Sequence, residues 1–428
     1  MNLSSIHSLF LECSSACTDT RKINKDCMFF ALKGDNFNGN LFAKEALENG
    51  ARFAIVDDEQ VAINRNYILV DDVLSTLQQL ATFHRRYLNI PIVALTGSNG
   101  KTTTKELIHA VLSKKYETTA TQGNLNNHIG VPLTLLSMTK RTEMGVVEMG
   151  ANHLKEIAFL CDIAEPDYGY ITNFGKAHLE GFGGVEGVIK GKSELYDALK
   201  ENKKLIFVNT SDKKQIEQLG EYKLSFSFGN DDAANCQIQL AETEPFVVAR
   251  YKNIDIKSNL IGTYNFNNIA AAIAIGHYFE VDNLSIKEAI EGYVPSNNRS
   301  QIIEKNGLKI ILDAYNANPT SMKAALDYFN EIEGAHKIVI LGDMFELGED
   351  AHKEHQYIAD YVTGINIDKV FLVGENFNGV LSKSNEIQQF NSFEALRAWL
   401  LEQSAVKEGV ILIKGSRGMA LERVLELI

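Results

Sequence analysis

Short apolar runs separated by helix-length segments fill the last third of the chain. The runs are 310–313, 338–343, 370–374 and 410–414. Uniformly apolar strands that alternate with helical segments predict a parallel sheet with helices on both faces. Ligands bind at the carboxyl ends of such strands, which is where Asp313, Asp343 and Lys414 lie.

Similar strands occur earlier and divide the chain into three regions. Residues 1–82 interleave short apolar runs with loops and helical segments, whereas residues 83–295 contain strands that end in polar residues. The regular alternation described above fills residues 296–428, after a turn-rich linker at 295–298. We therefore predict an α/β protein with three domains at these bounds. The earlier runs are 27–32, 52–56, 67–70, 92–95, 146–148, 170–173 and 205–209.

The run 92–95 leads into the most specific motif of the chain. It breaks at Gly97, passes Gly100 and continues through Lys101 and Thr102 into a segment with helical apolar spacing. Backbone N–H groups of such a turn and helix N-terminus bind phosphate, Lys101 neutralises its charge, and the Thr102 hydroxyl can ligate Mg²⁺. A plain strand-to-helix turn with a surface lysine is the alternative. The intact Gly-Lys-Thr context favours a site for a nucleoside triphosphate.

Composition and charge narrow the class of protein. The 428 residues are 45% hydrophobic and carry a formal net charge of −13 without a long basic run, so we expect no nucleic-acid partner. No apolar stretch approaches membrane-spanning length and the N-terminus lacks a signal pattern, so we expect no stable membrane insertion. The odd number of cysteines, without a Cys-x-x-Cys pair, indicates reduced thiols in a cytoplasmic enzyme. They are Cys13, Cys17, Cys27, Cys161 and Cys236.

Two other side chains of the middle region suit phosphate transfer. Glu148 ends an apolar strand, where its carboxylate can hold Mg²⁺ opposite Thr102. Helix capping, or a solvated strand end, is the alternative for Glu148. His178 lies just past another strand end, and its position alone leaves a structural and a functional role equally open.

Two further patterns are interpreted as structural. Residues 181–187 are rich in glycine but lack the spacing of a dinucleotide-binding motif, so we predict a flexible loop. His352 and His355 have a spacing that suits metal ligands. Because they follow an acidic loop and open a helix, a solvated helix face is the favoured interpretation.

The motifs of the middle region resemble those of the Mur ligase family, which acts in peptidoglycan precursor synthesis. Thr96-Gly-Ser-Asn-Gly-Lys-Thr102 resembles the shortened P-loop of that family. Four blocks are similar to those of its central domain, the last of them to the segment that contacts adenine. These blocks are 123–135, 148–150, 172–178 and 262–268.

The two ends of the chain extend this resemblance. Residues 19–21 and 31–39 resemble the block that holds the UDP part of the substrate. Residues 313–322, 341–348 and 414–419 resemble the branch of the family that adds D-Ala-D-Ala. The Asp-Asn-Pro-Arg signature of the diaminopimelate-adding branch is absent from the sequence.

The resemblance implies a small α/β UDP-binding N-terminal domain, a central P-loop ATPase-like domain with a parallel sheet, and a C-terminal Rossmann-like domain. It implies ATP and Mg²⁺ as cofactors and UDP-MurNAc-tripeptide and D-Ala-D-Ala as substrates; we expect a monomer. The implied catalytic residues are Lys101, Glu148, His178 and Lys192, and the metal ligands are Thr102, Glu148, His178 and carbamylated Lys192. The implied ATP-binding residues are Gly97, Ser98, Asn99, Gly100, Lys101, Thr102, Thr103, Asn265, Asn268, Arg299, Asp313 and Asn316. The implied substrate-binding residues are Thr20, Arg21, Lys33, Gly34, Asp35, Phe37, Asn38, Gly39, Asn126, Asn127, Asn318, Lys414, Ser416 and Arg417.

The chain departs from the pattern of the family in three places. Thr20 stands where the family usually has serine, and Asn298 precedes Arg299 where the family has glycine. Ser193 replaces the glycine of a Lys-Gly-Glu block. In relatives a lysine of this block reacts with CO₂ to become a carboxylate-like metal ligand. We carry that role onto Lys192, with Lys190 as the alternative register.

The implied reaction follows from the chemistry of amide formation. A carboxylate has no good leaving group, so ATP first converts it to an acyl phosphate, which the amine of D-Ala-D-Ala then attacks with release of phosphate. Another amide ligase of the superfamily, tripeptide-forming or folylpolyglutamate-forming, is the nearest alternative. A P-loop binding module without ligase activity is the alternative from another class. The sequence leaves open whether the third residue of the peptide is lysine or diaminopimelate.

Overall fold

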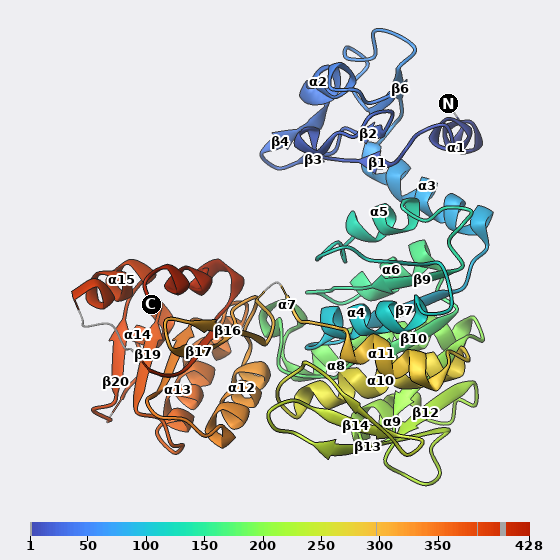
Figure 1. Ribbon diagram of the computed structural model, residues 1–428. Coiled ribbons are helices and arrows are strands. Elements are labelled where there is room, and N and C mark those ends of the chain that lie inside the picture. The colour runs from blue at the N-terminus through green and yellow to red at the C-terminus, as the bar shows by residue number, and fades with distance from the viewer. Residues whose placement is uncertain (1, 297, 383, 403–407) are drawn as a thin grey trace.

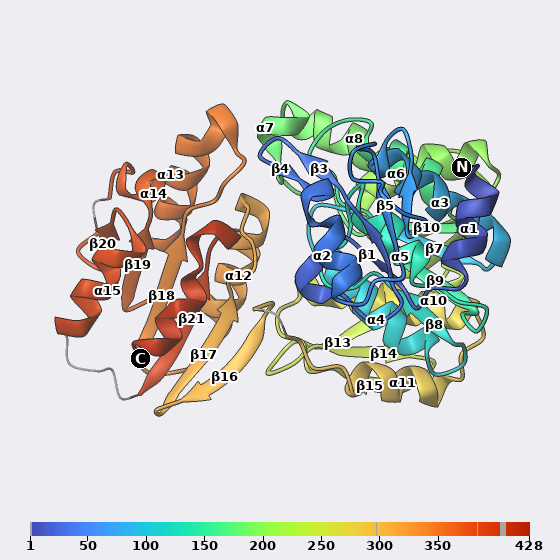
Figure 2. The same cartoon turned by 90° about the horizontal axis from the view of Figure 1, so that it is seen from above.

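The computed structural model describes residues 2–296, 298–382, 384–402 and 408–428. Figure 1 shows three lobes, with the N-terminal lobe above the middle lobe and the C-terminal lobe to one side. The view from above in Figure 2 shows the N-terminal lobe over the middle lobe and the C-terminal lobe beside both. The predicted three-domain α/β fold is confirmed. Residue 297 of the predicted linker lies outside the described residues.

The N-terminal lobe is built on a parallel sheet whose two faces are covered by different helices. Its strand order is β1 (Ala16–Cys17), β2 (Met28–Phe30), β5 (Phe53–Val56) and β6 (Tyr67–Leu69). Because side chains alternate along a strand, Phe29 packs towards α2 (Ala43–Glu48), whereas Met28 and Phe30 pack with α1 (Leu3–Phe10) and α3 (Val73–Leu88). A short hairpin of β3 (Lys33–Gly34) and β4 (Phe37–Asn38) projects from this lobe (Figure 1).

Helix α3 joins the N-terminal and middle lobes. Asp72 caps its start by accepting the Ser75 N–H at 2.6 Å, and the helix ends at Asn89, whose φ of 50° is left-handed. The expected domain boundary at residue 82 falls inside this helix. The continuous helix therefore connects the two lobes without a loop at that position.

The sheet of the middle lobe places the phosphate-binding motif at its centre. Its strand order is β15 (Ile254–Lys257), β14 (Val248–Tyr251), β13 (Cys236–Glu242), β12 (Ser225–Gly229), β11 (Leu205–Asn209), β10 (Tyr168–Ile171), β7 (Ile92–Thr96), β9 (Met144–Glu148) and β8 (Thr118–Ala120). The strands from β8 to β13 run parallel, and β14 and β15 extend the sheet antiparallel. One face packs on α4 (Lys101–Leu112) and α10 (Tyr264–Tyr278). Other helices of this lobe are α5 (Gly130–Leu136), α6 (Glu156–Ala164), α7 (Leu179–Phe182), α8 (Val185–Glu201), α9 (Lys213–Leu219) and α11 (Asn283–Glu291).

The sheet of the C-terminal lobe is covered by helices on both faces, as predicted. Its order is β16 (Gln301–Lys305), β17 (Leu308–Asp313), β21 (Gly409–Lys414), β18 (Lys337–Gly342), β19 (Lys369–Val373) and β20 (Ile387–Phe390), with only β16 antiparallel among the described strands. Ile311 and Val339 pack with α12 (Pro319–Glu331) and α13 (Ala351–Val362). Ile310 and Ile340 pack on the other face with α15 (Phe393–Glu402). The short α14 (Glu375–Asn378) follows β19.

Two sequence-based interpretations are wrong. Residues 181–187 are not a flexible loop, because α7 and α8 occupy most of this stretch and only Gly183 and Gly184 separate them. The glycines serve close packing instead. A Cβ at Gly187 would lie 1.8 Å from the Phe182 carbonyl oxygen, and one at Gly191 would lie 2.3 Å from the Phe182 ring. Glycine there lets α8 approach α7.

The second correction concerns His355, which is fully buried and not on a solvated helix face. Its Nε2 accepts the Met344 N–H at 2.9 Å, and its Nδ1–H donates to the Ala351 carbonyl at 2.6 Å. Only His352 and Lys353 of this turn are exposed. His355 therefore fixes the loop that follows β18. Among the described residues, no helix has the length and apolar character needed to cross a membrane.

Candidate active site between the middle and C-terminal lobes

A cavity of about 880 Å³ lies between the middle and C-terminal lobes. Most of the predicted ATP-site residues line it, together with some of the predicted substrate and metal residues. The predicted residues among its lining are Ser98, Asn99, Gly100, Lys101, Thr102, Thr103, Asn126, Asn127, Glu148, His178, Asn265, Asn268, Arg299, Asp313, Asn316, Asn318 and Lys414. No described residue of positions 2–82 is part of this lining.

The loop between β7 and α4 requires glycine at two positions. Gly97 and Gly100 have φ values of 144° and 79°, and a Cβ at Gly97 would lie 2.0 Å from the Thr172 hydroxyl. A Cβ at Gly100 would lie 2.5 Å from Asn268 Oδ1. Gly100 is also the N-cap of α4, and no described side chain caps it. The first N–H groups of α4 are therefore free to bind an anion.

Lys101 lies at the cavity wall without a carboxylate partner among the described residues. Its Nζ donates to the Gly97 carbonyl at 2.7 Å and to the Ser98 carbonyl at 3.4 Å. Burial lowers the pKa of Lys101, and the neighbouring Glu148 carboxylate partly opposes this effect. A bound polyphosphate would compensate the desolvated ammonium directly.

Glu148 ends β9 within reach of the phosphate loop. Its Oε1 accepts the Asn126 amide at 2.8 Å and the Thr102 hydroxyl at 3.3 Å. Its Oε2 is buried and has no hydrogen-bond partner among the described residues. The unpartnered Glu148 carboxylate oxygen and the Thr102 hydroxyl are hard oxygen ligands, which is the ligand type that Mg²⁺ prefers. Among the described residues, no cluster of three or more His, Cys, Asp or Glu side chains forms a metal site by itself.

The structure distinguishes the two lysines considered for carbamylation. Lys190 is exposed on α8, whereas Lys192 is fully buried. The Lys192 Nζ donates to the Ala151 carbonyl at 2.9 Å and lies 4.9 Å from the centroid of the Phe182 ring. Burial, and secondarily the charge of Lys101, lowers the pKa of Lys192 well below its ordinary value. Ala151 itself lines the cavity, so Lys192 lies directly behind its wall.

His178 lines the cavity and contacts a residue that the sequence analysis did not single out. Its Nδ1 pairs with the carboxylate of Glu346, which lies in the loop between β18 and α13 of the C-terminal lobe. This contact lowers the pKa of Glu346. Glu346 belongs to the block 341–348. Nothing in the sequence connects it with His178, which lies far earlier in the chain.

The nucleotide side of the cavity combines buried amides with a cation on an aromatic ring. Asn268 donates to Asn265 Oδ1 at 2.8 Å and accepts the Thr104 hydroxyl at 3.0 Å. The Arg299 guanidinium lies 3.7 Å from the centroid of the Tyr315 ring. Tyr315 was not predicted as a site residue, although it stands beside Asn316 in the recognised block. The flat Arg299–Tyr315 pair offers a stacking surface at the cavity wall.

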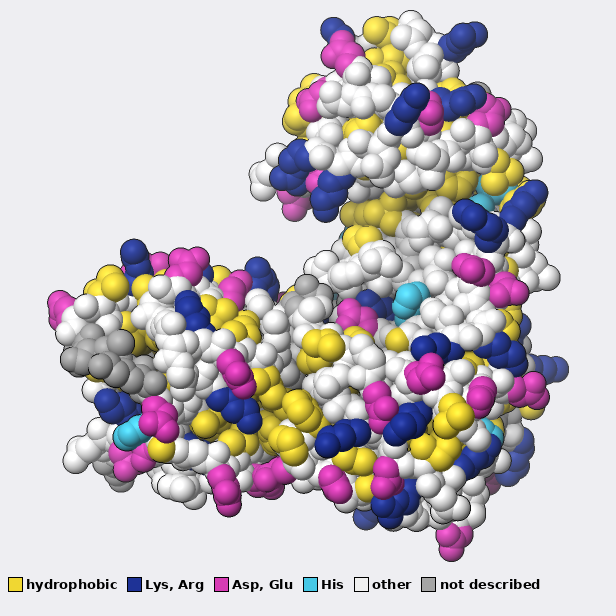
Figure 3. Space-filling view, viewed as in Figure 1, with side chains coloured by type: hydrophobic (Ala, Val, Ile, Leu, Met, Phe, Trp, Pro, Cys, Tyr) yellow, Lys and Arg dark blue, Asp and Glu magenta, His cyan; other side chains and the backbone are white. Residues whose placement is uncertain are grey.

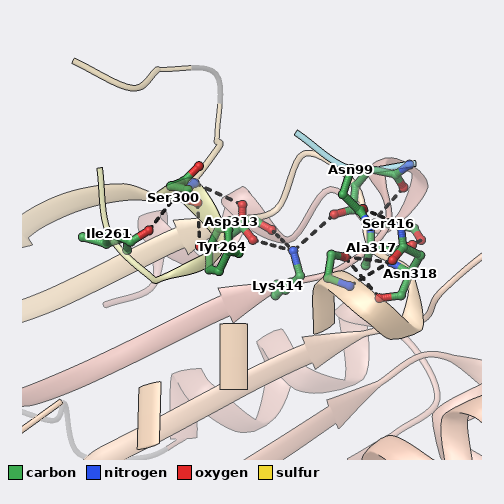
Figure 4. A network of polar contacts seen from close by, with 12 residues as sticks. Asn99, Ile261, Tyr264, Ser300, Asp313, Ala317, Asn318, Lys414 and Ser416 are labelled. Carbon is green, nitrogen blue, oxygen red and sulfur yellow. Dashed lines mark hydrogen bonds and ion pairs between the residues drawn. The ribbon is translucent and has the colours of Figure 1, made fainter. Parts of the chain in front are cut away.

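The loop after β17 connects the nucleotide side with the C-terminal lobe, as Figure 4 shows. Lys414 forms an ion pair with Asp313, and Asp313 Oδ1 accepts the Ser300 N–H at 3.0 Å. Asn318 caps α12 and also donates to Asn99 Oδ1 at 2.7 Å, so the two lobes touch within the phosphate loop.

Two of the predicted substrate-binding residues of the C-terminal lobe are not in the cavity lining. Ser416 is buried and accepts the Phe345 N–H at 3.0 Å, which holds the loop that carries Glu346. The side chain of Arg417 is 59% exposed, and its guanidinium pairs with Glu422 at 2.6 Å.

The residues predicted to hold the UDP moiety form a separate surface on the N-terminal lobe. Arg21 makes a two-pronged pair with Asp19, with both distances 2.9 Å, and Lys33 pairs with Asp57 at 2.8 Å. Phe37 is half-exposed and stacks on Phe42 with 5.3 Å between ring centroids. Other predicted members of this surface are Thr20, Gly34, Asp35, Asn38 and Gly39.

Family models match the chain in three consecutive segments. Residues 14–85 match the model described as Mur ligase family, catalytic domain. Residues 95–276 match the Mur ligase middle domain. Residues 298–417 match the model described as Mur ligase, glutamate ligase domain.

Relatives that align over nearly the full length of the chain are named for the same ligase activity. The chain is 37% identical over 424 residues to the UDP-N-acetylmuramoyl-tripeptide–D-alanyl-D-alanine ligase of Bacillus subtilis (strain 168), covering 96% of this chain and 92% of that protein. It is 33% identical over 421 residues to the ligase of that name from Escherichia coli (strain K12), covering 95% and 92%.

Solved structures agree with these relatives. MurF from Acinetobacter baumannii superposes with a TM-score of 0.86 at 28% identity, covering 99% of this chain and 98% of that one. The MurF ligase of Thermotoga maritima, in complex with ADP, gives a TM-score of 0.83 at 28% identity, covering 98% and 97%.

Proposed function

The chain belongs to the Mur ligase family, and we propose that it is an ATP-dependent ligase that joins D-alanyl-D-alanine to UDP-N-acetylmuramoyl-tripeptide. The activity shared by its full-length relatives carries this proposal. The cavity supports it, because a phosphate loop, an open carboxylate and the C-terminal Lys414 meet there. The product is the UDP-MurNAc-pentapeptide used in peptidoglycan synthesis.

Lys101 and the α4 N-terminus act on the phosphoryl group. The carboxylate of the tripeptide attacks the γ-phosphorus of ATP, so that a carboxyl C–O–P bond forms as ADP leaves. Lys101 and the free N–H groups of α4 stabilise the charge that develops on the transferred group. The amine of D-Ala-D-Ala then attacks the acyl carbon, inorganic phosphate leaves, and one proton is released.

Thr102 and Glu148 would hold one Mg²⁺ in this proposal, and His178 and carbamylated Lys192 would hold a second. Such ions would neutralise the anionic groups that must approach each other. The open Oε2 of Glu148 supports the first site. The burial of Lys192 supports the second, since a neutral amine is the form that adds to CO₂. Addition of CO₂ to the neutral amine releases one proton and forms an anionic carbamate, and the lowered pKa of Lys192 favours the neutral amine that reacts.

The remaining predicted residues divide among three ligands. Asn265, Asn268, Arg299, Asp313 and Asn316 form the ATP side, and the stacked Arg299–Tyr315 pair supports a base next to them. We assign the UDP-linked substrate to the surface of residues 19–39 and to Asn126 and Asn127. We assign the carboxylate of the dipeptide to Lys414 and Arg417, with Asn318 and Ser416 nearby.

We also propose that the protein acts in the cytoplasm as a monomer. The five cysteines are free thiols, as expected in a reducing compartment.

The test is phosphate release measured with ATP, UDP-MurNAc-tripeptide and D-Ala-D-Ala, each omitted in turn. We expect release that requires all three and a stoichiometric pentapeptide product identified by mass. Parallel assays with lysine-containing and diaminopimelate-containing tripeptides define the third residue. Release that depends on glutamate or diaminopimelate as the amine would favour another amide ligase, and ATP binding without any amine-dependent turnover would favour a binding module.

A further inference from the structure

The loop between β18 and α13 reaches from the C-terminal lobe onto the start of α7 in the middle lobe. The Glu346 carbonyl accepts the Glu180 N–H at 3.2 Å, and the Glu346 carboxylate pairs with His178 Nδ1. Gly348 sits against Glu180, where a Cβ would lie 3.2 Å from the Glu180 side chain. The loop is therefore docked by its backbone as well as by its charge.

Both residues of this pair have unusual backbone conformations. His178 has φ of 53° and Glu346 has φ of 63°, in the left-handed region that non-glycine residues rarely occupy. Such conformations persist only where the surrounding structure holds them, and they concentrate at functional sites. Each conformation aims a side chain at the other lobe.

The contact has a chemical consequence for the imidazole. The Glu346 carboxylate is the acidic group that faces Nδ1, close enough to form an ion pair although the geometry is not that of a hydrogen bond. Because a carboxylate can only accept hydrogen bonds, this contact favours the ring form with the proton on Nδ1. Nε2 is then the ring nitrogen with a free lone pair. His178 lines the cavity, while its Nδ1 is screened from solvent, so Nε2 is the nitrogen left for a ligand there. Metal-binding histidines commonly donate their other N–H to a carboxylate, which fixes tautomer and ring orientation.

We propose that Glu346 is a positioning residue that fixes His178 as the Nδ1-protonated tautomer, with Nε2 presented to a divalent cation. This inference rests on the proposed function, which makes His178 a metal ligand. Because His178 and Glu346 belong to different lobes, the His178 ring is held in this way only when the C-terminal lobe is docked. Cation affinity and lobe docking are thus coupled.

The docking itself does not depend on Glu346. Lys176 pairs with the buried Glu354 at 2.6 Å, its N–H donates to Thr320 at 3.0 Å, and Asn318 contacts Asn99. Loss of the Glu346 carboxylate therefore leaves other contacts between the lobes. Glu354→Gln is a matched control, because it removes an ion pair between the same two lobes without touching His178.

The test measures Mn²⁺ binding by electron paramagnetic resonance on the full chain with a non-hydrolysable ATP analogue and bicarbonate. We expect Glu346→Ala to weaken one Mn²⁺ by about 10- to 100-fold, Glu346→Gln to weaken it less because its amide oxygen still accepts, and Glu354→Gln to leave it within about twofold. Long-range ¹⁵N–¹H correlation of the histidines should show His178 protonated at Nδ1 in the unaltered protein. Thermal melting confirms that each variant is folded.

Two results separate the inference from the function on which it rests. If His178→Ala weakens Mn²⁺ but Glu346→Ala does not, or if His178 is protonated at Nε2 in the unaltered protein, the positioning role is wrong and the ligand assignment stands. If His178→Ala leaves both Mn²⁺ ions unaffected, the ligand assignment fails and the inference fails with it.

Discussion

The phosphate cavity and the N-terminal surface of residues 19–39 use charged side chains in opposite ways. At the cavity, Lys101 has no carboxylate partner among the described residues, and the buried Glu148 Oε2 has no hydrogen-bond partner among them. On the N-terminal surface, Arg21 and Lys33 already pair with Asp19 and Asp57. If the two surfaces bind their ligands as proposed, the nucleotide half is preorganised, whereas the other half exchanges existing ion pairs for its ligand.

The arrangement of the lobes deepens this contrast. Figure 3 shows open space between the N-terminal and C-terminal lobes on this face, with charges of both signs interspersed over the surface. No described residue of positions 2–82 lines the cavity. In the proposed function, the UDP-linked substrate therefore extends from one surface to the other, or the lobes approach each other when it binds. Changes in the cavity should lower kcat, and changes on the N-terminal surface should raise one KM.

The strongest test of the preorganised half is Lys101→Ala. Removing an ammonium aimed at the transferred phosphoryl group should lower kcat by about 10²- to 10³-fold without unfolding the protein. Lys114→Ala is the control, because the one ion pair of Lys114 among the described residues is a surface pair with Glu288. Steady-state ligase assays and circular dichroism measure the two effects. Near-normal turnover in folded Lys101→Ala would remove Lys101 from the chemistry.

Lys192→Ala tests whether the buried Lys192 belongs, like Lys101, to the nucleotide half of the site. We expect a loss in kcat of about a hundredfold, because the proposed carbamate ligand of the second Mg²⁺ would be lost. Acetate should partly restore the rate by occupying the vacated carboxylate position. Lys190→Ala is the matched control on the exposed side of α8 and should stay near the unaltered rate. A rate that acetate cannot raise would argue for a packing role.

The N-terminal surface should respond differently. The Arg21 side chain is 86% exposed and, among the described side chains, pairs only with Asp19. Arg21→Ala should raise the KM for the UDP-linked substrate about tenfold, which is the loss in affinity expected when one charged contact to a phosphate is removed. The KM for ATP and the kcat should change little. Arg52→Ala, which breaks a surface pair with Glu12 in the same lobe, provides the comparison. A matching rise in the KM for ATP would show that the two halves are not separable.

The contrast also explains what the sequence could and could not predict. The parallel strands were predictable because their uniform apolar runs are buried on both faces, as in β7 and β18. The antiparallel extension from β13 to β15 was missed, because strands such as β15 carry polar residues at alternate positions and lack the uniform apolar runs that identified the parallel strands. The α7 helix was missed because glycine signals flexibility in a sequence, whereas here it permits close packing.

For the site, short-range motifs were readable and contacts across lobes were not. The phosphate loop is one continuous segment, so its spacing alone identifies it. Glu346 contacts His178 because the C-terminal lobe packs against α7, and a single sequence does not show which residues of two lobes come into contact. Tyr315 was adjacent to a recognised residue, and its stacking with Arg299 appears only once β17 is placed.

The smallest effect is expected for Arg417, which lies outside the cavity lining and, like the cations of the N-terminal surface, is already paired with a carboxylate. Its side chain is 59% exposed and already paired with Glu422, so its contribution to a bound carboxylate should resemble that of a surface ion pair, up to about 1 kcal/mol. Arg417→Ala should therefore raise the KM for D-Ala-D-Ala about two- to fivefold and leave the other two KM values unchanged. Arg423→Ala, which breaks a neighbouring surface pair with Glu394, is the matched control. Equal changes in all three KM values, or none, would leave Lys414 as the cation assigned to the dipeptide and return Arg417 to a purely structural role.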